Sequence, residues 1–145
     1  MELSFSPALP GDAETIFRFA RELIQTYEDP NILDPDRAIQ WTRRKIETHI
    51  LQYTCVYADG EPAGFFRFCP CDNGMELDDL YILPQFRNRG IGSAVVTRCI
   101  RQSRCPIELY AFIQNTGAIR LYRRHGFEIT QQVSPTRCIL RREVL

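Results

Sequence analysis

The sequence predicts a mixed α/β fold, in which a central sheet is flanked by helices within one domain, residues 1–145. Two observations carry this prediction. Apolar residues recur at helical spacing in some segments and fill short, strand-sized runs in others, and Gly, Pro, Asn and Asp separate these segments. Taken along the chain, the segments predict the order β-α-α-β-β-β-α-β-α-β-β. A chain of 145 residues is long enough to bury a core of this kind.

The N-terminal third is predicted to form a strand and two helices. Residues 3–9 form the strand. Asp12 is the expected N-cap of the first helix, which continues to Tyr27 because apolar residues recur there every three or four positions. Asp34 is the expected cap of the second helix and Pro35 its first residue, which is a favoured arrangement.

The middle third is predicted to form three strands. Residues 53–58 and 63–69 are expected to pair as a hairpin around Asp59-Gly60, a dipeptide that favours tight turns. Residues 70–74 then turn the chain. Residues 75–83 form the third strand, which we expect at the centre of the sheet.

The C-terminal part is predicted to continue with a helix, a strand, a second helix and a closing pair of strands. In order, these cover residues 90–103, 106–113, 115–124, 127–133 and 136–144. Asn115 is a good helix N-cap, and Gly126 is expected to stop the same helix as a left-handed C′ residue. Ser134-Pro135 is the expected turn between the closing strands.

A basic loop with two glycines joins the central strand to the helix that follows it. Gly90 and Gly92 let the backbone approach a ligand closely. The N–H groups of the loop and of the first helical turn lack helical acceptors, and the helix dipole adds partial positive charge there. Arg87 and Arg89 add two full charges. This combination predicts an anion site, most often for phosphate.

Two motifs resemble those of a known family. The loop Arg87-Asn88-Arg89-Gly90-Ile91-Gly92 lacks the Lys-Ser/Thr pair of a P-loop and the three-glycine spacing of a dinucleotide fold. It resembles the R/Q-x-x-G-x-G/A loop of the GNAT acyltransferase superfamily, which holds the pyrophosphate of acetyl-CoA, and residues 80–87 resemble the strand before that loop. Residues 115–127 resemble the second motif of the family, N-x-x-A-x-x-L/F-Y-x-x-x-G-F. The two motifs stand in the order that the family has, with a strand-sized segment between them.

The resemblance implies a GNAT-like α/β domain. Its central sheet would be mixed but mostly antiparallel, with about seven strands, and four helices would flank it. In this fold the sheet is splayed at a slot that receives acyl-CoA. Acetyl-CoA is therefore the expected cosubstrate, without a metal, and the expected reaction is transfer of its acetyl group to a primary amine by an acetyltransferase.

The resemblance also assigns the residues that would hold the cofactor. The loop and the first helical turn would grip its phosphates with Arg87, Asn88, Arg89, Gly90, Ile91, Gly92 and Ser93. The end of the central strand would place Tyr81, Ile82 and Leu83 along the pantetheine arm, and the Ile82 amide is the candidate donor that polarises the thioester carbonyl. Asn115 is both a helix cap and, in the family, a frequent cofactor contact.

Tyr122 is the candidate general acid. It occupies the position at which the family often has a tyrosine that protonates the CoA thiolate. A phenol with a pKa near ~10 can give a proton to a thiolate with a pKa near ~8.5 once a site shifts both values. The alternative is that Tyr122 only packs beside Leu121 against the sheet.

Three carboxylates in the central strand, Glu76, Asp78 and Asp79, are the candidate bases, because an alkyl ammonium must lose a proton before it can attack. Strand alternation sends Glu76 and Asp78 to one face and Asp79 to the other unless a bulge intervenes, and the family commonly has a bulge here. Burying three carboxylates is costly without cationic partners. The alternative is therefore that they neutralise Arg67 or another arginine across the sheet.

The acidic strand also bears on the substrate. Residues 77–82, LDDLYI, are similar to the L-E-D-x-x-V segment of spermidine/spermine acetyltransferases, with Asp78 in place of the glutamate. The expected acceptor is a small cationic amine: a polyamine, an aminoglycoside-like compound, or an amine of a protein. The alternative from another class is a non-catalytic acyl-CoA-binding module that acts as a sensor or scaffold.

Composition excludes several kinds of partner. The formal net charge is zero, so no overall field attracts nucleic acid or an acidic membrane. No apolar run approaches the ~20 residues of a membrane span, and no signal pattern opens the chain, so we expect a cytoplasmic location. A small-molecule amine is the expected partner, and a homodimer is left open.

The remaining cysteines, histidines and basic residues are predicted to be structural. The six cysteines fall mostly in apolar stretches and are expected to be small buried residues, because Cys69-x-Cys71 has no companion pair for zinc. His49 and His125 are expected at a helix surface and a helix end. The run Arg43-Arg44-Lys45 is expected on a solvated helix face.

Overall fold

The computed structural model describes residues 1–144 and has the predicted order of helices and strands. The elements are β1 (Leu3–Pro7), α1 (Ala13–Tyr27), α2 (Pro35–Thr48), β2 (Tyr53–Ala58), β3 (Glu61–Cys71), β4 (Gly74–Ile82), α3 (Ile91–Gln102), β5 (Ile107–Phe112), α4 (Thr116–Arg124), β6 (Glu128–Gln132) and β7 (Arg137–Arg142). Single 3₁₀ turns also occur at Pro10–Asp12, Ile50–Gln52 and Pro84–Phe86.

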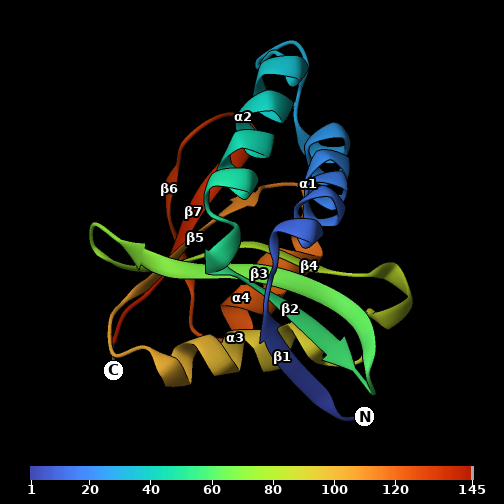
Figure 1. The fold of residues 1–145 in the computed structure, drawn as a ribbon. Helices are drawn as coiled ribbons and strands as arrows, with labels where there is room; N and C mark the ends of the chain where they lie inside the picture. The colour runs from blue at the N-terminus through green and yellow to red at the C-terminus, as the bar shows by residue number, and fades with distance from the viewer. Residues whose placement is uncertain (145) are drawn as a thin grey trace.

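The strands of the described residues form one seven-stranded sheet in the order β1-β2-β3-β4-β5-β7-β6. Neighbouring strands are antiparallel except β4 and β5, which are parallel. Helices α1 and α2 cover one face of the sheet, and α3 and α4 cover the other (Figure 1). This confirms the predicted mixed, mostly antiparallel sheet of about seven strands flanked by four helices.

Each face of the sheet has its own apolar core. Under α1 and α2, fully buried side chains such as Ile16 and Ile46 pack on Tyr53 of β2. Under α3 and α4, Val95 and Val96 pack with Phe127, which is 0% exposed. Burying one side chain of this size stabilises the fold by roughly 1.5–3 kcal/mol, so the two cores hold both helix pairs on the sheet.

Most of the predicted start and stop signals are confirmed. The Asp34 side chain accepts a hydrogen bond from the Asp36 amide at 3.0 Å, and the Asn115 side chain accepts one from the Ala118 amide at 3.4 Å. Gly126 is left-handed, with φ 91°. Asp12 stands at the predicted N-cap position of α1, but its side chain does not cap the helix, because the carboxylate accepts from the Leu9 amide at 2.8 Å and holds the 3₁₀ turn before α1.

The hairpin of β2 and β3 was also predicted, but β3 is longer than expected. It continues through Cys71 instead of ending at Cys69, because Pro70 and Cys71 pair with Met75 and Gly74 at the start of β4. The turn into β4 is therefore tighter than the sequence suggested.

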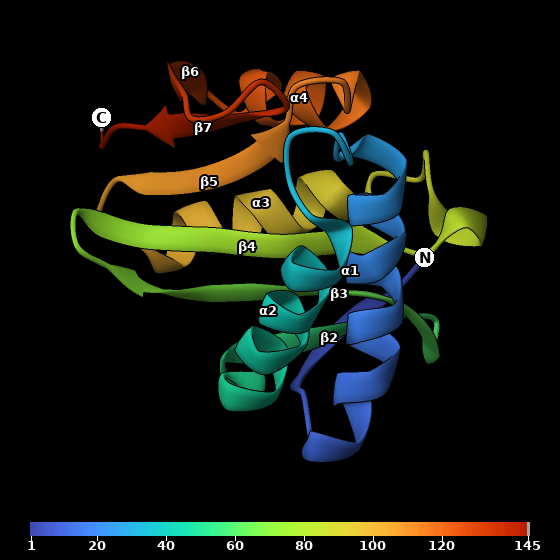
Figure 2. The ribbon, with the colours of Figure 1, turned by 90° about the horizontal axis from the view of Figure 1, so that it is seen from above.

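A bulge in β4 and a split beside it confirm the predicted splay of the sheet. Arg67 pairs with Asp78 and Phe65 with Tyr81, so two residues of β4 lie opposite one residue of β3. Asp79 takes up the extra length with a φ of 51°. On the other side, β4 pairs with β5 only at its first residues, Met75 and Glu76, and the two strands then separate (Figure 2).

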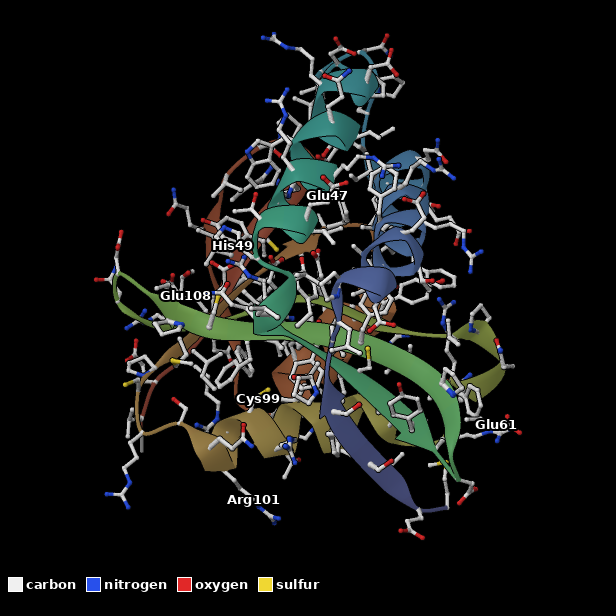
Figure 3. All side chains as sticks on the ribbon, in the orientation of Figure 1. Glu47, His49, Glu61, Cys99, Arg101 and Glu108 are labelled. Atoms are coloured by element: carbon white, nitrogen blue, oxygen red, sulfur yellow. The ribbon has the colours of Figure 1, made fainter. Side chains whose placement is uncertain are left out.

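The six cysteines are free. Cys69, Cys99 and Cys138 are buried, and Cys99 lies between α3 and the sheet (Figure 3), whereas Cys105 is exposed. Within residues 1–144, no group of three or more His, Cys, Asp or Glu is arranged to hold a metal ion. No helix in the same part of the chain is long and apolar enough to cross a membrane.

Candidate active site at the split in the sheet

The basic loop after β4 has the backbone geometry expected of an anion site. Asn88 and Gly90 both have positive φ, 63° and 81°, and α3 begins at Ile91 directly after Gly90. A Cβ at Gly90 would meet nothing within 4 Å, so there is room for a side chain at this position. Glycine is favoured there because the backbone is left-handed, a conformation that other residues rarely adopt. A Cβ at Gly92 would lie 3.0 Å from Leu121, so Gly92 lets α3 approach α4 closely.

Arg87 fastens this loop to the end of β4. Its Nε donates to the Ile82 carbonyl at 3.0 Å, and its guanidinium lies 5.2 Å from the centre of the Tyr81 ring. Arg89 instead stacks over Phe86 at 5.6 Å. The Ser93 hydroxyl lies 3.2 Å from Nε2 of His125, which joins the first turn of α3 to the end of α4.

A cavity of about 590 Å³, called here the loop cavity, lies in front of the loop and the first turn of α3. Of the predicted cofactor residues, those that line it are Tyr81, Ile82, Arg87, Asn88, Gly90, Ile91, Gly92, Ser93 and Asn115. Leu83 and Arg89 are the two predicted cofactor residues that do not. Nine of the 11 predicted cofactor residues therefore lie in the wall of one cavity, where they make up fewer than half of the lining residues.

The Ile82 amide faces the split. The Leu83 amide donates to the Ala63 carbonyl of β3 at 2.8 Å. Along an antiparallel strand the backbone groups of successive residues point to opposite sides, so the N–H and C=O of Ile82 point away from β3. On that side β5 has already separated from β4, and the Ile82 carbonyl accepts from Arg87 there. The Ile82 N–H is thus aimed into the gap.

A second cavity of about 770 Å³, called here the large cavity, lies between α2 and the strands β4, β5 and β7. The residues that line both cavities are Leu23, Leu80, Asn115, Ala118 and Tyr122. The two cavities therefore meet where β4 and β5 separate, with α4 along the junction.

Asp78 and Asp79 lie together in the wall of the large cavity, because the bulge turns both toward α2. Lys45 Nζ lies 3.0 Å from Asp78 Oδ2 and 2.9 Å from Asp79 Oδ2. Arg67 adds a contact of 3.3 Å to Asp78, and the Tyr53 hydroxyl donates to Asp79 at 2.5 Å. The expected neutralisation by Arg67 is confirmed for Asp78, and Lys45 contacts both carboxylates.

The prediction of a solvated face for residues 43–45 was wrong for Lys45. Its side chain is only 13% exposed, because α2 packs on the sheet with this residue directed at the bulge. Burial alone would lower the pKa of Lys45, but the charges of Asp79 and Asp78 outweigh burial and raise it. Lys45 therefore remains a cation in the wall of the cavity.

Burial sets the acid–base properties of the strand carboxylates. It raises the pKa of Asp79, the charge of Asp78 adds to the rise, and Lys45 and Tyr53 oppose it. Burial and then Asp78 raise the pKa of Glu76. Glu76 does not line either cavity, so of the three candidate bases only Asp78 and Asp79 are at the surface of the site.

Tyr122 stands at the junction of the two cavities. Its ring is 8% exposed and packs edge-on against Phe127 with 5.9 Å between ring centres. Burial, and then the charge of Asp78, raises the pKa of the phenol. The hydroxyl is therefore a proton donor at neutral pH. The structure shows both the packing of Tyr122 and its place at the junction, and its role as the general acid stays a prediction.

The sequence did not identify Lys45, Tyr53 or the residues that line the outer part of the large cavity. The lysine offered one signal, because it is the chain's single lysine among many arginines. That signal does not say which residues Lys45 meets. The exposure of Trp41 on α2, 64%, and of Tyr110 on β5, 45%, is known only from the structure.

Comparisons with known proteins relate the chain to a family. A profile of the Acetyltransferase (GNAT) family matches residues 16–127. An uncharacterized N-acetyltransferase of Methanocaldococcus jannaschii is 34% identical over 82 residues, which cover 48% of this chain and 36% of that protein. The spore coat polysaccharide biosynthesis protein SpsD of Bacillus subtilis is 27% identical over 136 residues, which cover 86% of this chain and 47% of that protein. The chain thus spans less than half the length of either curated relative.

Solved structures share the fold. The PaiA N-acetyltransferase from Thermoplasma acidophilum, in complex with coenzyme A, superposes with a TM-score of 0.75 at 19% identity and covers 99% of both chains. The N-acetylglutamate synthase from Neisseria gonorrhoeae, complexed with coenzyme A and L-arginine, has a TM-score of 0.70 at 20% identity and covers 98% of this chain and 33% of that one. With the family profile matching well over half of its residues, the chain belongs to the acetyltransferase (GNAT) family.

Proposed function

We propose that the protein, acting as one domain, is an N-acetyltransferase that moves the acetyl group of acetyl-CoA to a primary amine. The observation that carries this proposal is the meeting of the two cavities at Tyr122. One cavity is lined by a glycine-bearing, basic loop suited to phosphates, and the other is lined by two carboxylates suited to an ammonium group. A transfer between two substrates needs such a junction.

Acetyl-CoA would bind with its phosphates at the loop cavity and its acetyl group at the junction. The amides after Gly90 and the dipole of α3 suit the phosphates. The Ile82 N–H would donate to the thioester carbonyl oxygen. A donor aimed at an oxygen on which negative charge develops lowers the barrier of acyl transfer.

The acceptor amine would enter through the large cavity as an ammonium cation. At pH 7 only on the order of one in a few thousand alkyl amines is neutral, so a base must take a proton before attack. The pair Asp78 and Asp79 would attract the ammonium and accept that proton, directly or through water. Their known contacts with Lys45, Arg67 and Tyr53 all use Oδ2, which favours Oδ1 as the substrate-facing atom.

Tyr122 would complete the reaction. As the amine nitrogen bonds to the acetyl carbon, the carbon–sulfur bond breaks, and the phenol gives its proton to the departing thiolate. The balance is one acetyl-CoA and one ammonium giving one amide, one CoA thiol and one proton. The proton lost by Tyr122 returns from solvent or from the base.

The test is thiol release from acetyl-CoA in the presence of a panel of primary amines, with the acetylated amine identified by mass. Release that depends on both substrates supports the proposal. A non-catalytic acyl-CoA-binding module is the alternative, and it would bind acetyl-CoA in calorimetry without any amine-dependent release of thiol. Failure to bind acetyl-CoA at all would contradict both.

A further inference from the structure

The charges that line the large cavity do not cancel. Asp78 and Asp79 are matched by Lys45 inside the cavity wall and by Arg67 behind it. Once these pairs are set aside, the charged side chains left in the lining are three arginines and one glutamate: Arg37, Arg44, Arg137 and Glu28. The part of the cavity outside the carboxylate pair is therefore positively charged.

None of the three arginines is neutralised within the part of the chain that the structure describes. Within residues 1–144, Arg37, Arg44 and Arg137 make no ion pair with a carboxylate. Glu28 is occupied elsewhere, since its Oε1 accepts from the Thr136 hydroxyl and from the Asp29 amide. Several unpaired guanidinium groups around one cavity are suited to an oxyanion, which each can bind through two parallel hydrogen bonds.

On the helix side, the basic residues form one stripe that leads out from the reaction centre. Arg37, Trp41 and Lys45 follow one another at intervals of four positions on α2, and Arg44 lies three positions after Trp41, so the four occupy neighbouring rows on one side of the helix. Lys45 Nζ lies 5.6 Å from the centre of the Trp41 ring, and the same atom contacts the carboxylates of Asp78 and Asp79. Arg37 and Arg44 continue the stripe toward the mouth of the cavity.

On the strand side, Arg137 is held in place by aromatic rings. Its guanidinium lies 5.3 Å from the centre of the Tyr110 ring and 5.8 Å from that of Phe112, and all three residues line the large cavity. Stacking of this kind fixes the plane of the guanidinium but leaves its N–H groups free to donate. Arg137 of β7 thus lines the cavity from the side opposite the α2 stripe.

We infer that the acceptor is a small amine that also carries an oxyanion, a carboxylate or a phosphate, which binds Arg137 and the α2 arginines while the amine lies at Asp78 and Asp79. The inference rests on the proposed N-acetyl transfer and narrows its acceptor. It also changes the class of acceptor expected from the acidic residues of β4. The carboxylates serve the ammonium end alone, and a second cationic end, as in a polyamine, would face unpaired arginines and be repelled.

The experiment compares straight-chain amines that differ only at the far end. At each of several chain lengths, the set contains an unsubstituted alkylamine, a diamine, an ω-amino carboxylate and an aminoalkyl phosphate, and kcat/KM is measured for each by thiol release. We expect one oxyanion member to exceed the diamine of equal length by about tenfold or more, the range given by a hydrogen bond to a charged group. The carboxylate and phosphate members show which oxyanion is preferred.

Variants tie this preference to the cavity. Arg137→Gln and Arg44→Gln should each reduce the ratio of oxyanion to diamine several-fold, mainly through KM, and Arg137→Lys should restore part of it because the charge returns without the planar fork. Arg101→Gln is the control, because Arg101 lies on the far side of the sheet, on α3, and lines neither cavity (Figure 3). Added salt should lower the preference, since Arg37 and Arg44 are exposed.

The outcomes separate this inference from the proposal beneath it. If amines are acetylated but the diamines equal or exceed the oxyanion members, the inference is wrong and the acetyltransferase stands. A preference that survives Arg137→Gln combined with Arg44→Gln also overturns it, because another group then reads the oxyanion. If no member of any set causes thiol release, the proposed function fails and takes the inference with it.

Discussion

Lys45 Nζ lies 2.9 Å from Asp79 Oδ2, and this contact joins the middle of α2 to the bulge of β4. The side chains are 13% and 18% exposed, so the pair is largely shielded from solvent. It connects α2, which lines the large cavity, with β4, which carries the candidate base. A substitution at Lys45 should therefore change both the free energy of unfolding and the pH dependence of catalysis.

We expect Lys45→Met to destabilise the protein by about 3 kcal/mol, because it leaves two carboxylates in a shielded site with less compensation. The pKa of Asp79 is already raised by burial, and Lys45 opposes the rise. Without Lys45 this pKa should rise further, so the acidic limb of kcat/KM should move to higher pH. Urea denaturation and a pH–rate profile measure the two effects.

Lys45→Arg is the matched control for this variant, because it keeps the positive charge. It should recover most of the lost stability and return the acidic limb toward its original pH. An unchanged pH profile in Lys45→Met would mean that the acidic limb of kcat/KM does not report the pKa of Asp79.

Glu76 offers a test of stability against pH. Burial, followed by the charge of Asp78, raises its pKa in the folded protein above the unfolded value of about 4.3. A raised carboxyl pKa favours folding fully below the unfolded pKa, and this advantage is lost as pH rises through the folded pKa. The neutral variant Glu76→Gln should therefore have a higher Tm than wild type at pH 7–8, and the gain should shrink toward pH 4.

The same variant, compared with a variant of Asp78, separates Glu76 from Asp78 as the candidate base. Glu76 lines neither cavity, so Glu76→Gln should keep kcat/KM within about threefold of wild type, whereas Asp78→Asn should lose about 100-fold, as expected for removal of a general base. Steady-state thiol release measures both. The reverse order of effects would make Glu76 the base and remove Asp78 from that role.

Much of the fold was predictable because its signals are local. Asp34 caps α2 and Asn115 caps α4 with bonds to amides two and three residues away, and both could be read from a few neighbouring letters. Asp12 takes the N-cap position of α1, but its carboxylate accepts from the Leu9 amide instead of from an amide of α1. Local chemistry decides such contacts, and local sequence reports it well.

The interior of the site was less predictable because it is built by packing between distant segments. Lys45 meets Asp79 from 34 positions away, since α2 crosses the bulge of β4. In the sequence Lys45 follows two arginines, so the three residues together predict a solvated helix face. No neighbouring residue indicates which of the three side chains points toward the sheet. Arg137 likewise reaches the large cavity only because β7 lies beside β5.

Tyr122→Phe tests the general acid. Phenylalanine keeps the ring that packs on Phe127, so stability and affinity for CoA should change little, within about 1 kcal/mol. Losing the proton donor should lower kcat by about 100-fold. Tyr57→Phe is the control, because Tyr57 lies on β2 and lines neither cavity. Equal kcat in wild type and Tyr122→Phe would show that the thiolate leaves without this acid.

Two glycines with the same backbone allow a sharp test of the cofactor loop. Gly90 and Gly60 have φ values of 81° and 82°, and a Cβ at either would meet nothing within 4 Å. Glutamate at each position should therefore cost similar backbone strain, about 1–2 kcal/mol for a left-handed residue. Gly90 lines the loop cavity, where a carboxylate would repel phosphate, whereas Gly60 lies in the β2–β3 turn.

Calorimetry with acetyl-CoA should therefore find that Gly90→Glu weakens binding at least about tenfold while Gly60→Glu binds like wild type, although both lose similar stability in urea. The comparison removes strain as an explanation, because both variants carry it. Charge at the loop is then the remaining difference. If both variants bind acetyl-CoA equally well, the phosphates lie elsewhere and the assignment of the loop cavity is wrong.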